Sequence, residues 1–85
     1  MNKQLTSLPN IGKKLEEQLN RVGIKTPDDL VKCGSQKTWL KIKATDPTAC
    51  LNRLLALEGA IQNIRWYDLP DKDKERLREF YRDSK

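Results

Sequence analysis

The sequence predicts an all-α protein, a compact bundle of five to six short helices. Apolar residues recur at helical spacing in several segments, and proline or glycine bounds each segment as expected at helix ends. No segment shows the alternating apolar and polar pattern of a strand. The 85 residues, 36% hydrophobic and 34% charged, suffice for one small core. We therefore expect residues 1–85 to form a single helical domain.

The N-terminal part is expected to contain a tight turn followed by a helix. Residues 2–7 offer only about one helical turn. The next stretch, Leu8-Pro9-Asn10-Ile11-Gly12, combines a proline with the two residue types that most readily take positive φ. A helix to about Val22 is then predicted, ended by Gly23, with an apolar stripe of Ile11, Leu15, Leu19 and Val22.

The start of that helix carries an unusual charge. The free N–H groups and positive dipole end of a helix favour acids, yet Lys13 and Lys14 stand in the first turn. A phosphate group bound there would compensate both. The alternative is that these are ordinary solvated lysines, partly balanced by Glu16 and Glu17. The phosphate interpretation predicts a nucleic-acid-binding site of Asn10, Gly12, Lys13 and Lys14, with Lys25 in the far loop.

A second short helix is predicted with a clear start. Thr26 is expected as its N-cap, Pro27 at its first position and Asp29 at its third. Gly34 ends it. Its inward residues are expected to be Leu30, Val31 and Cys33, so that residues 8–33 form a hairpin of two helices around Gly23.

The third helix is expected from a Ser35 cap through Thr45. Trp39 lies in it among lysines and has two interpretations. It is either a stacking surface for nucleic acid or a core anchor. The core is favoured, because aromatic side chains supply much of the burial in a small domain.

Asp46 and Pro47 are expected to open the longest helix, the core spine of residues 47–63. Its apolar residues cover more than one stripe, so burial on two sides is predicted. Small residues at 56, 59 and 60 would let neighbouring helices approach closely. Glu58 among them is either a catalytic carboxylate or a capping or ion-paired residue, and the second role is favoured.

The C-terminal part is expected to contain a connector and a last helix. The aromatic residues of the connector, residues 65–70, are expected to fold back on the spine. A helix over residues 70–82 follows, beginning at Pro70, with Leu77, Phe80 and Tyr81 facing inward and charged residues facing solvent.

Composition excludes several classes of function. The chain has no histidine, no Cys-x-x-Cys pair and no activated nucleophile, so no enzyme, metal or cofactor is expected. Cys33 and Cys50 are expected to be reduced and buried in the core. No spanning segment or secretory pattern is seen, which predicts a cytoplasmic protein without membrane contact.

The net charge of +5 is unevenly distributed. Residues 1–45 hold nine Lys and Arg against four Asp and Glu, and the rest of the chain is balanced. An anionic partner for the hairpin region would explain this asymmetry, and so would an ordinary solubility charge.

Four pieces of the chain carry a resemblance to a known family. They are Leu8 to Gly12, Gly23-Ile24 with Thr26 and Asp29-Leu30, Ala56 to Ala60, and Trp66 with Leu69-Pro70. In order and spacing they resemble the C-terminal domain of the bacterial competence regulator TfoX (Sxy). The first piece is similar to the helix-hairpin-helix element of DNA-binding proteins, with Asn10 where most such hairpins have glycine. The resemblance implies a transcription or competence-related role with DNA or a DNA-bound partner.

We therefore expect a non-enzymatic binding module that contacts the nucleic-acid phosphate backbone through Leu8 to Lys14, without reading sequence. The alternative is a protein interaction domain, for example for a partner of the transcription machinery, with no nucleic-acid contact. A homodimer is possible in either case.

Overall fold

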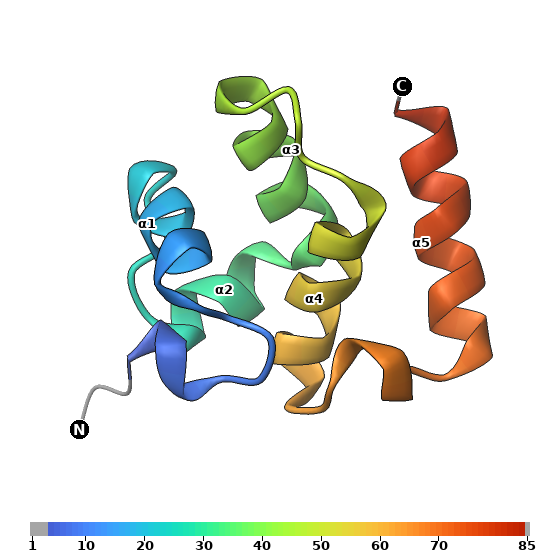
Figure 1. Cartoon of the computed structure of the whole chain (residues 1–85), viewed down its shortest axis with the longest axis horizontal. Coiled ribbons are helices and arrows are strands. Elements are labelled where there is room, and N and C mark those ends of the chain that lie inside the picture. The colour runs from blue at the N-terminus through green and yellow to red at the C-terminus, as the bar shows by residue number, and fades with distance from the viewer. Residues whose placement is uncertain (1–3, 85) are drawn as a thin grey trace.

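The computed structural model describes residues 4–84 and is all-helical, as the sequence predicts (Figure 1). The first residues of the predicted N-terminal turn, Asn2 among them, lie outside the described residues. No strand occurs within the described range. The elements in order are η1 (Leu5–Ser7), α1 (Lys13–Arg21), α2 (Pro27–Cys33), α3 (Ser35–Thr45), α4 (Leu51–Gln62), η2 (Trp66–Asp68) and α5 (Asp71–Asp83).

Helix α4 is the centre of the bundle. It contacts α2, α3, α5 and η2, with α1 and α2 on one side of it and α5 on the other in Figure 1. Burial of apolar side chains on more than one face explains this position. The core contains fully buried large side chains from six of the seven elements: Leu5, Leu19, Leu30, Trp39, Ile42, Leu54, Leu57 and Leu77.

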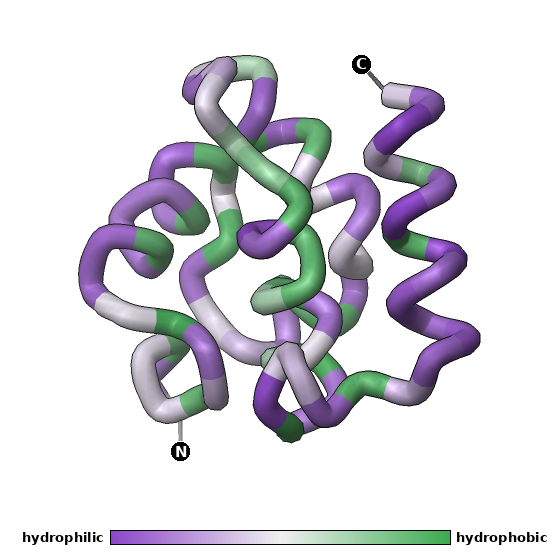
Figure 2. Tube along the Cα trace, turned by 45° about the vertical axis from the view of Figure 1, so that its right-hand side comes forward, coloured by the Kyte–Doolittle hydropathy of each residue, from purple (hydrophilic) through white to green (hydrophobic). Residues whose placement is uncertain are grey.

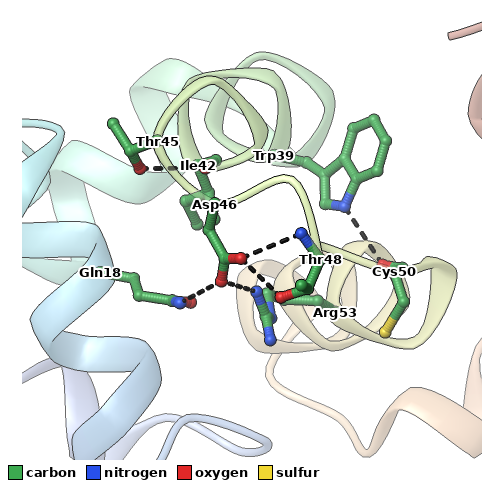
Figure 3. Close-up of polar contacts among 8 residues, drawn as sticks. All are labelled: Gln18, Trp39, Ile42, Thr45, Asp46, Thr48, Cys50 and Arg53. Carbon is green, nitrogen blue, oxygen red and sulfur yellow. Dashed lines mark hydrogen bonds and ion pairs between the residues drawn. The ribbon is translucent and has the colours of Figure 1, made fainter. Parts of the chain in front are cut away.

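Helix α4 begins later than the sequence predicts, at Leu51 rather than at Pro47. Asp46 does not cap it. The Asp46 Oδ1 instead accepts hydrogen bonds from the Thr48 N–H (3.0 Å) and hydroxyl, which folds residues 46–48 into a turn (Figure 3). An aspartate side chain that accepts from the backbone N–H two residues ahead favours a turn, and this turn competes with the helix for the same backbone.

The same Asp46 carboxylate joins two helices to this turn. Its Oδ2 accepts from Gln18 Nε2 of α1 at 2.8 Å and pairs with Arg53 Nη1 of α4 at 2.9 Å (Figure 3). The bonds from Thr48, then Arg53 and Gln18, hold the pKa of Asp46 well below its usual range. Asp46 is thus a polar junction between α1, α3 and α4.

The start of α2 follows the prediction. The Thr26 hydroxyl accepts from the Asp29 N–H at 3.1 Å, and Asp29 Oδ2 accepts from the Thr26 N–H at 3.2 Å. This reciprocal capping box leaves no free donor at Thr26. Gly34, with φ +85, ends α2 as expected. Val31, however, is 56% exposed, so its predicted inward position is wrong.

Trp39 is a core anchor, as the sequence favours. It is fully buried and contacts Phe80 and Tyr81 of α5 edge-to-face, at centroid distances of 6.1 and 5.5 Å. Its Nε1–H donates to the Cys50 carbonyl at 3.1 Å (Figure 3). A stacking role for Trp39 on nucleic acid is therefore excluded.

Helix α5 uses one stripe to pack on the bundle. Figure 2 shows it as mostly hydrophilic with isolated hydrophobic positions, as a helix with one packed face should be. Leu77 is fully buried, and Phe80 and Tyr81 pack against the core, which confirms the predicted inward residues.

Three other expectations are wrong or need revision. Ser35 is the first residue of α3, after the N-cap Gly34, and its hydroxyl donates to Glu58 instead of capping. The two cysteines are not both buried. Cys33 is half-buried, and Cys50 is exposed because it precedes α4 rather than lying inside it. The connector does fold back on the spine, since η2 contacts α4, but the side chains of Trp66 and Tyr67 remain exposed.

Candidate nucleic-acid interface

The turn between η1 and α1 is anchored by its apolar residues. Ile11 is buried and Leu8 packs against the core, so both ends of the turn are fixed. Of the two residues suited to positive φ, only Asn10 takes it, with φ 71. Gly12 has φ −97 and extended backbone geometry. The left-handed residue of the turn is therefore an asparagine, a residue type that tolerates this region better than most.

Asn10 also fastens the turn to the far half of the chain. Its Nδ2 donates to the carbonyls of Ile64 (3.0 Å) and Ala56 (3.4 Å), and its Oδ1 accepts from the Trp66 N–H at 3.2 Å. The side-chain amide is thus used within the fold. Asn10 contributes to the predicted site by giving the turn its shape and not by offering its side chain to a ligand.

The close packing at this point depends on Gly59. A Cβ at position 59 would lie 2.6 Å from Asn10 Nδ2 and 2.8 Å from the Ile64 carbonyl oxygen. Only a glycine lets the turn lie against α4 in this way. The predicted close approach at the small residues of the spine is confirmed, and the neighbour is the hairpin turn.

The start of α1 is open to solvent. Gly12 is its N-cap and has no side chain to accept a bond from the first-turn N–H groups. The Gly12 carbonyl accepts from the Glu16 N–H at 2.9 Å, as in a regular helix. Lys13 and Lys14 are both exposed, and a Cβ on Gly12 would meet no protein atom within 4 Å. The start of α1 therefore combines N–H groups without a side-chain cap and two exposed lysines.

A shallow polar depression of about 520 Å³ lies beside this helix start. It is lined by residues of η1 and the turn and by one residue from the far end of the chain: Thr6, Ser7, Leu8, Pro9, Asn10, Ile11, Gly12 and Arg65. Arg65 is exposed and adds a cation next to the turn. Sequence reasoning does not bring Arg65 to the hairpin, because the bonds that do so join Asn10 to the two neighbours of Arg65, Ile64 and Trp66, which are distant from it in sequence.

Lys25 is placed differently from the other predicted residues. It is exposed in the loop after α1, whereas Lys13 is at the opposite end of that helix. Its backbone N–H donates to Asp29 Oδ2 at 3.2 Å, so it belongs to the capped start of α2. That bond is the main cause that lowers the pKa of Asp29. The structure brings Asn10, Gly12, Lys13 and Lys14 together, and Arg65 with them.

Glu58, the other residue considered for chemistry, has structural partners. Its Oε1 accepts from Ser35 Oγ and its Oε2 from Gln62 Nε2, both at 2.6 Å. Arg76 Nη2 lies 3.8 Å from Oε2. These contacts join α3, α4 and α5, which agrees with the favoured ion-paired role.

Comparison with known proteins points to one family. The sequence profile of the TfoX C-terminal domain matches residues 1–81. Two crystal structures of Listeria monocytogenes proteins, one titled uncharacterized (triclinic form) and one of unknown function (tetragonal form), are each 44% identical to the chain. Their TM-scores are 0.94 and 0.93; the matches cover 95% of this chain and 92% and 99% of theirs. None of the curated proteins matches it. Within residues 4–84, no helix is long and apolar enough to span a membrane.

Proposed function

Because the chain belongs to the TfoX C-terminal domain family, we propose that it is a non-enzymatic binding module that holds a nucleic-acid phosphate backbone at the hairpin turn. The observation that carries the proposal is the uncapped start of α1, with Lys13 and Lys14 exposed on it and Arg65 beside the same depression. A cytoplasmic role in transcription or competence belongs to the same proposal.

The contact would be made by backbone and cationic groups. The N–H groups of Gly12 and Lys13 point a partial positive charge at one phosphate oxygen, and Lys13 and Lys14 neutralise its charge. Arg65 adds a guanidinium at the same depression, suited to a neighbouring phosphate. No base edge is read by this set, so it gives position on the strand and not sequence.

The expected affinity is low for one module. A single hairpin of this kind belongs in the non-specific range, with a Kd of roughly 10⁻⁴ to 10⁻⁶ M at physiological salt. A homodimer or a second DNA-bound partner would raise it by doubling the contacts. Lys25, in the loop beyond α1, would join only a strand that extends along the domain.

A protein interaction domain is the second candidate. The observation that favours it is the exposed aromatic pair of η2, where Trp66 is 39% and Tyr67 56% exposed. Exposed aromatic side chains next to one another are common at protein interfaces.

The test is the salt dependence of duplex DNA binding by the double variant Lys13→Glu/Lys14→Glu. Loss of two phosphate contacts should lower the slope of log K against log salt by about 1.8. The matched control is Lys37→Glu/Lys41→Glu on α3, which changes the net charge equally at two other exposed lysines. An equal effect of both variants, or no binding by the parent at roughly 50 mM salt, would favour the protein interaction domain.

A further inference from the structure

The aromatic residues of the chain are divided between the core and one surface site. Trp39, Phe80 and Tyr81 pack together in the core. Trp66 and Tyr67 lie side by side on η2, exposed, with ring centroids 5.6 Å apart and planes at 86°. In this edge-to-face arrangement the two ring planes are nearly perpendicular, and part of each side chain remains accessible to a further flat group.

The backbone of this aromatic pair is hydrogen-bonded to the hairpin and to α5. The Trp66 N–H donates to Asn10 Oδ1, and the Trp66 Cα lies against Gly59 of α4. On the other side, Lys74 Nζ donates to the Tyr67 carbonyl at 2.9 Å. The same Asn10 that shapes the hairpin turn therefore joins it to the backbone of the aromatic pair.

Cations lie at both ends of the pair. Arg65 precedes it and lines the depression beside Gly12, and Lys74 Nζ bonds the Tyr67 carbonyl on the α5 side, where the exposed acids Asp68 and Asp71 also lie. Because Arg65 lies between the pair and the hairpin lysines in this arrangement of charges, an anionic strand that crosses the pair can continue towards the hairpin.

We infer that Trp66 and Tyr67 form a base-stacking platform, and that the ligand of this surface is single-stranded nucleic acid in preference to duplex. The inference rests on the proposed function, because the hairpin supplies the phosphate contacts. Unpaired bases can lie flat on aromatic rings, while the bases of a duplex are already stacked on one another. Exposed aromatic rings together with cationic side chains are the combination that binds single strands without sequence preference.

The test compares binding of an oligothymidylate of about 12 nucleotides, within the usual site size, with binding of a duplex of equal length. The full chain should bind the single strand more tightly. Trp66→Ala should weaken that binding about tenfold and leave duplex binding unchanged. Trp66→Phe, which keeps a flat ring, should restore most of it. Leu40→Ala is the control for loss of an exposed apolar side chain elsewhere.

Intrinsic fluorescence gives a second readout. Trp39 is fully buried, so quenching by the single strand should come from Trp66 and vanish in Trp66→Phe even though binding persists. Equal affinity for both forms, or a Trp66→Ala variant that is folded and binds the single strand normally, would overturn the inference. The proposed function would survive that result if duplex binding still depends on Lys13 and Lys14. Binding of neither form would overturn both.

Discussion

Asn10 lies so close to Gly59 that a methyl group on residue 59 would come within 2.6 Å of its amide nitrogen. The contact joins the hairpin turn to the central helix α4, and the three hydrogen bonds of Asn10 surround it. The candidate site is therefore not a separate loop but part of the packing of the domain.

Substitutions of Asn10 should separate the contribution of its hydrogen bonds from the cost of its positive φ. Asn10→Ala loses three hydrogen bonds and places a side chain at φ 71, so we expect a loss of about 2 to 4 kcal/mol in unfolding free energy. Asn10→Gly loses the same bonds without the conformational cost, so its unfolding free energy should exceed that of Asn10→Ala by about 1 kcal/mol. Urea denaturation measures both. Losses below about 0.5 kcal/mol in both variants would mean that the bonds contribute little.

Gly59→Ala should be destabilising although alanine is the better helix former. The added Cβ would meet Asn10 Nδ2 and the Ile64 carbonyl, and such overpacking costs about 1 to 3 kcal/mol. Gly12→Ala is the matched control, since its Cβ meets no atom within 4 Å. It should cost less, about 0.5 to 1 kcal/mol, because alanine is a poorer N-cap than glycine but meets no clash there. Equal thermal shifts for the two variants would argue against the close contact at Gly59.

Acid should destabilise the domain through Asp46. The hydrogen bonds from Thr48, Arg53 and Gln18 stabilise the ionised carboxylate, so its pKa in the folded protein is below the ordinary value. A lowered pKa gives stability that is present above the unfolded value and disappears as the pH falls. Stability should thus decline from about pH 5 downward.

In Asp46→Asn that decline should be shallower, because the titrating group is gone. Asp28→Asn, at an exposed position of α2, is the control and should keep the parent profile. Denaturation midpoints at several pH values measure the effect. Parallel profiles for Asp46→Asn and the parent would show that the junction is not sensitive to charge.

Most of the fold follows from interactions between residues that are close in sequence. The start of α4 differs from the prediction because it depends on residues that are distant in sequence. The capping box of Thr26 and Asp29 and the positive φ of Gly34 involve neighbouring residues, so the sequence predicts them correctly. The start of α4 was misplaced because Asp46-Pro47 fits both an N-cap and a turn. Gln18 and Arg53, distant in sequence, add bonds that hold the carboxylate in the turn.

The residues of the candidate site also fall into those that can be predicted from neighbours in sequence and those that cannot. The turn and its lysines are local and could be predicted, whereas Arg65 and the exposed aromatic pair depend on Asn10 bonding to Trp66 across the fold. The sequence predicts that the aromatic residues of the connector fold back on the spine, and it does not predict that their side chains stay exposed. Instead, the Asp68 N–H donates to the Arg65 carbonyl and the Leu69 N–H donates to the Trp66 carbonyl, and these bonds form η2. No residue of η2 is buried, whereas Leu69, which follows it, is.

Arg65 should contribute to nucleic-acid binding as one cation. Arg65→Ala is expected to lower the slope of log K against log salt by about 0.9, half the effect of the two-lysine variant. Arg78→Ala on the exposed part of α5 is the control and should leave the slope unchanged. If the slope is the same for both arginine variants and the parent, Arg65 lies near the site but does not contact a phosphate.

The two thiols should react at different rates. Cys50 is exposed before α4, and Cys33 is half-buried against the core. Cys50 should therefore react with a thiol reagent in the folded protein well before Cys33, and Cys50→Ser should remove the fast phase. Fast labelling of Cys50→Ser at Cys33 would contradict the packing of α2.

The contact between Asn10 and α4 also sets an order in which the domain can be completed. The ribosome makes the hairpin early, but the carbonyls and the N–H group that fix Asn10 belong to residues 56, 64 and 66. A nascent chain that has reached only the end of α3 lacks every one of these partners. The turn that comes first in translation thus receives its supporting bonds only when most of the polypeptide has been synthesised.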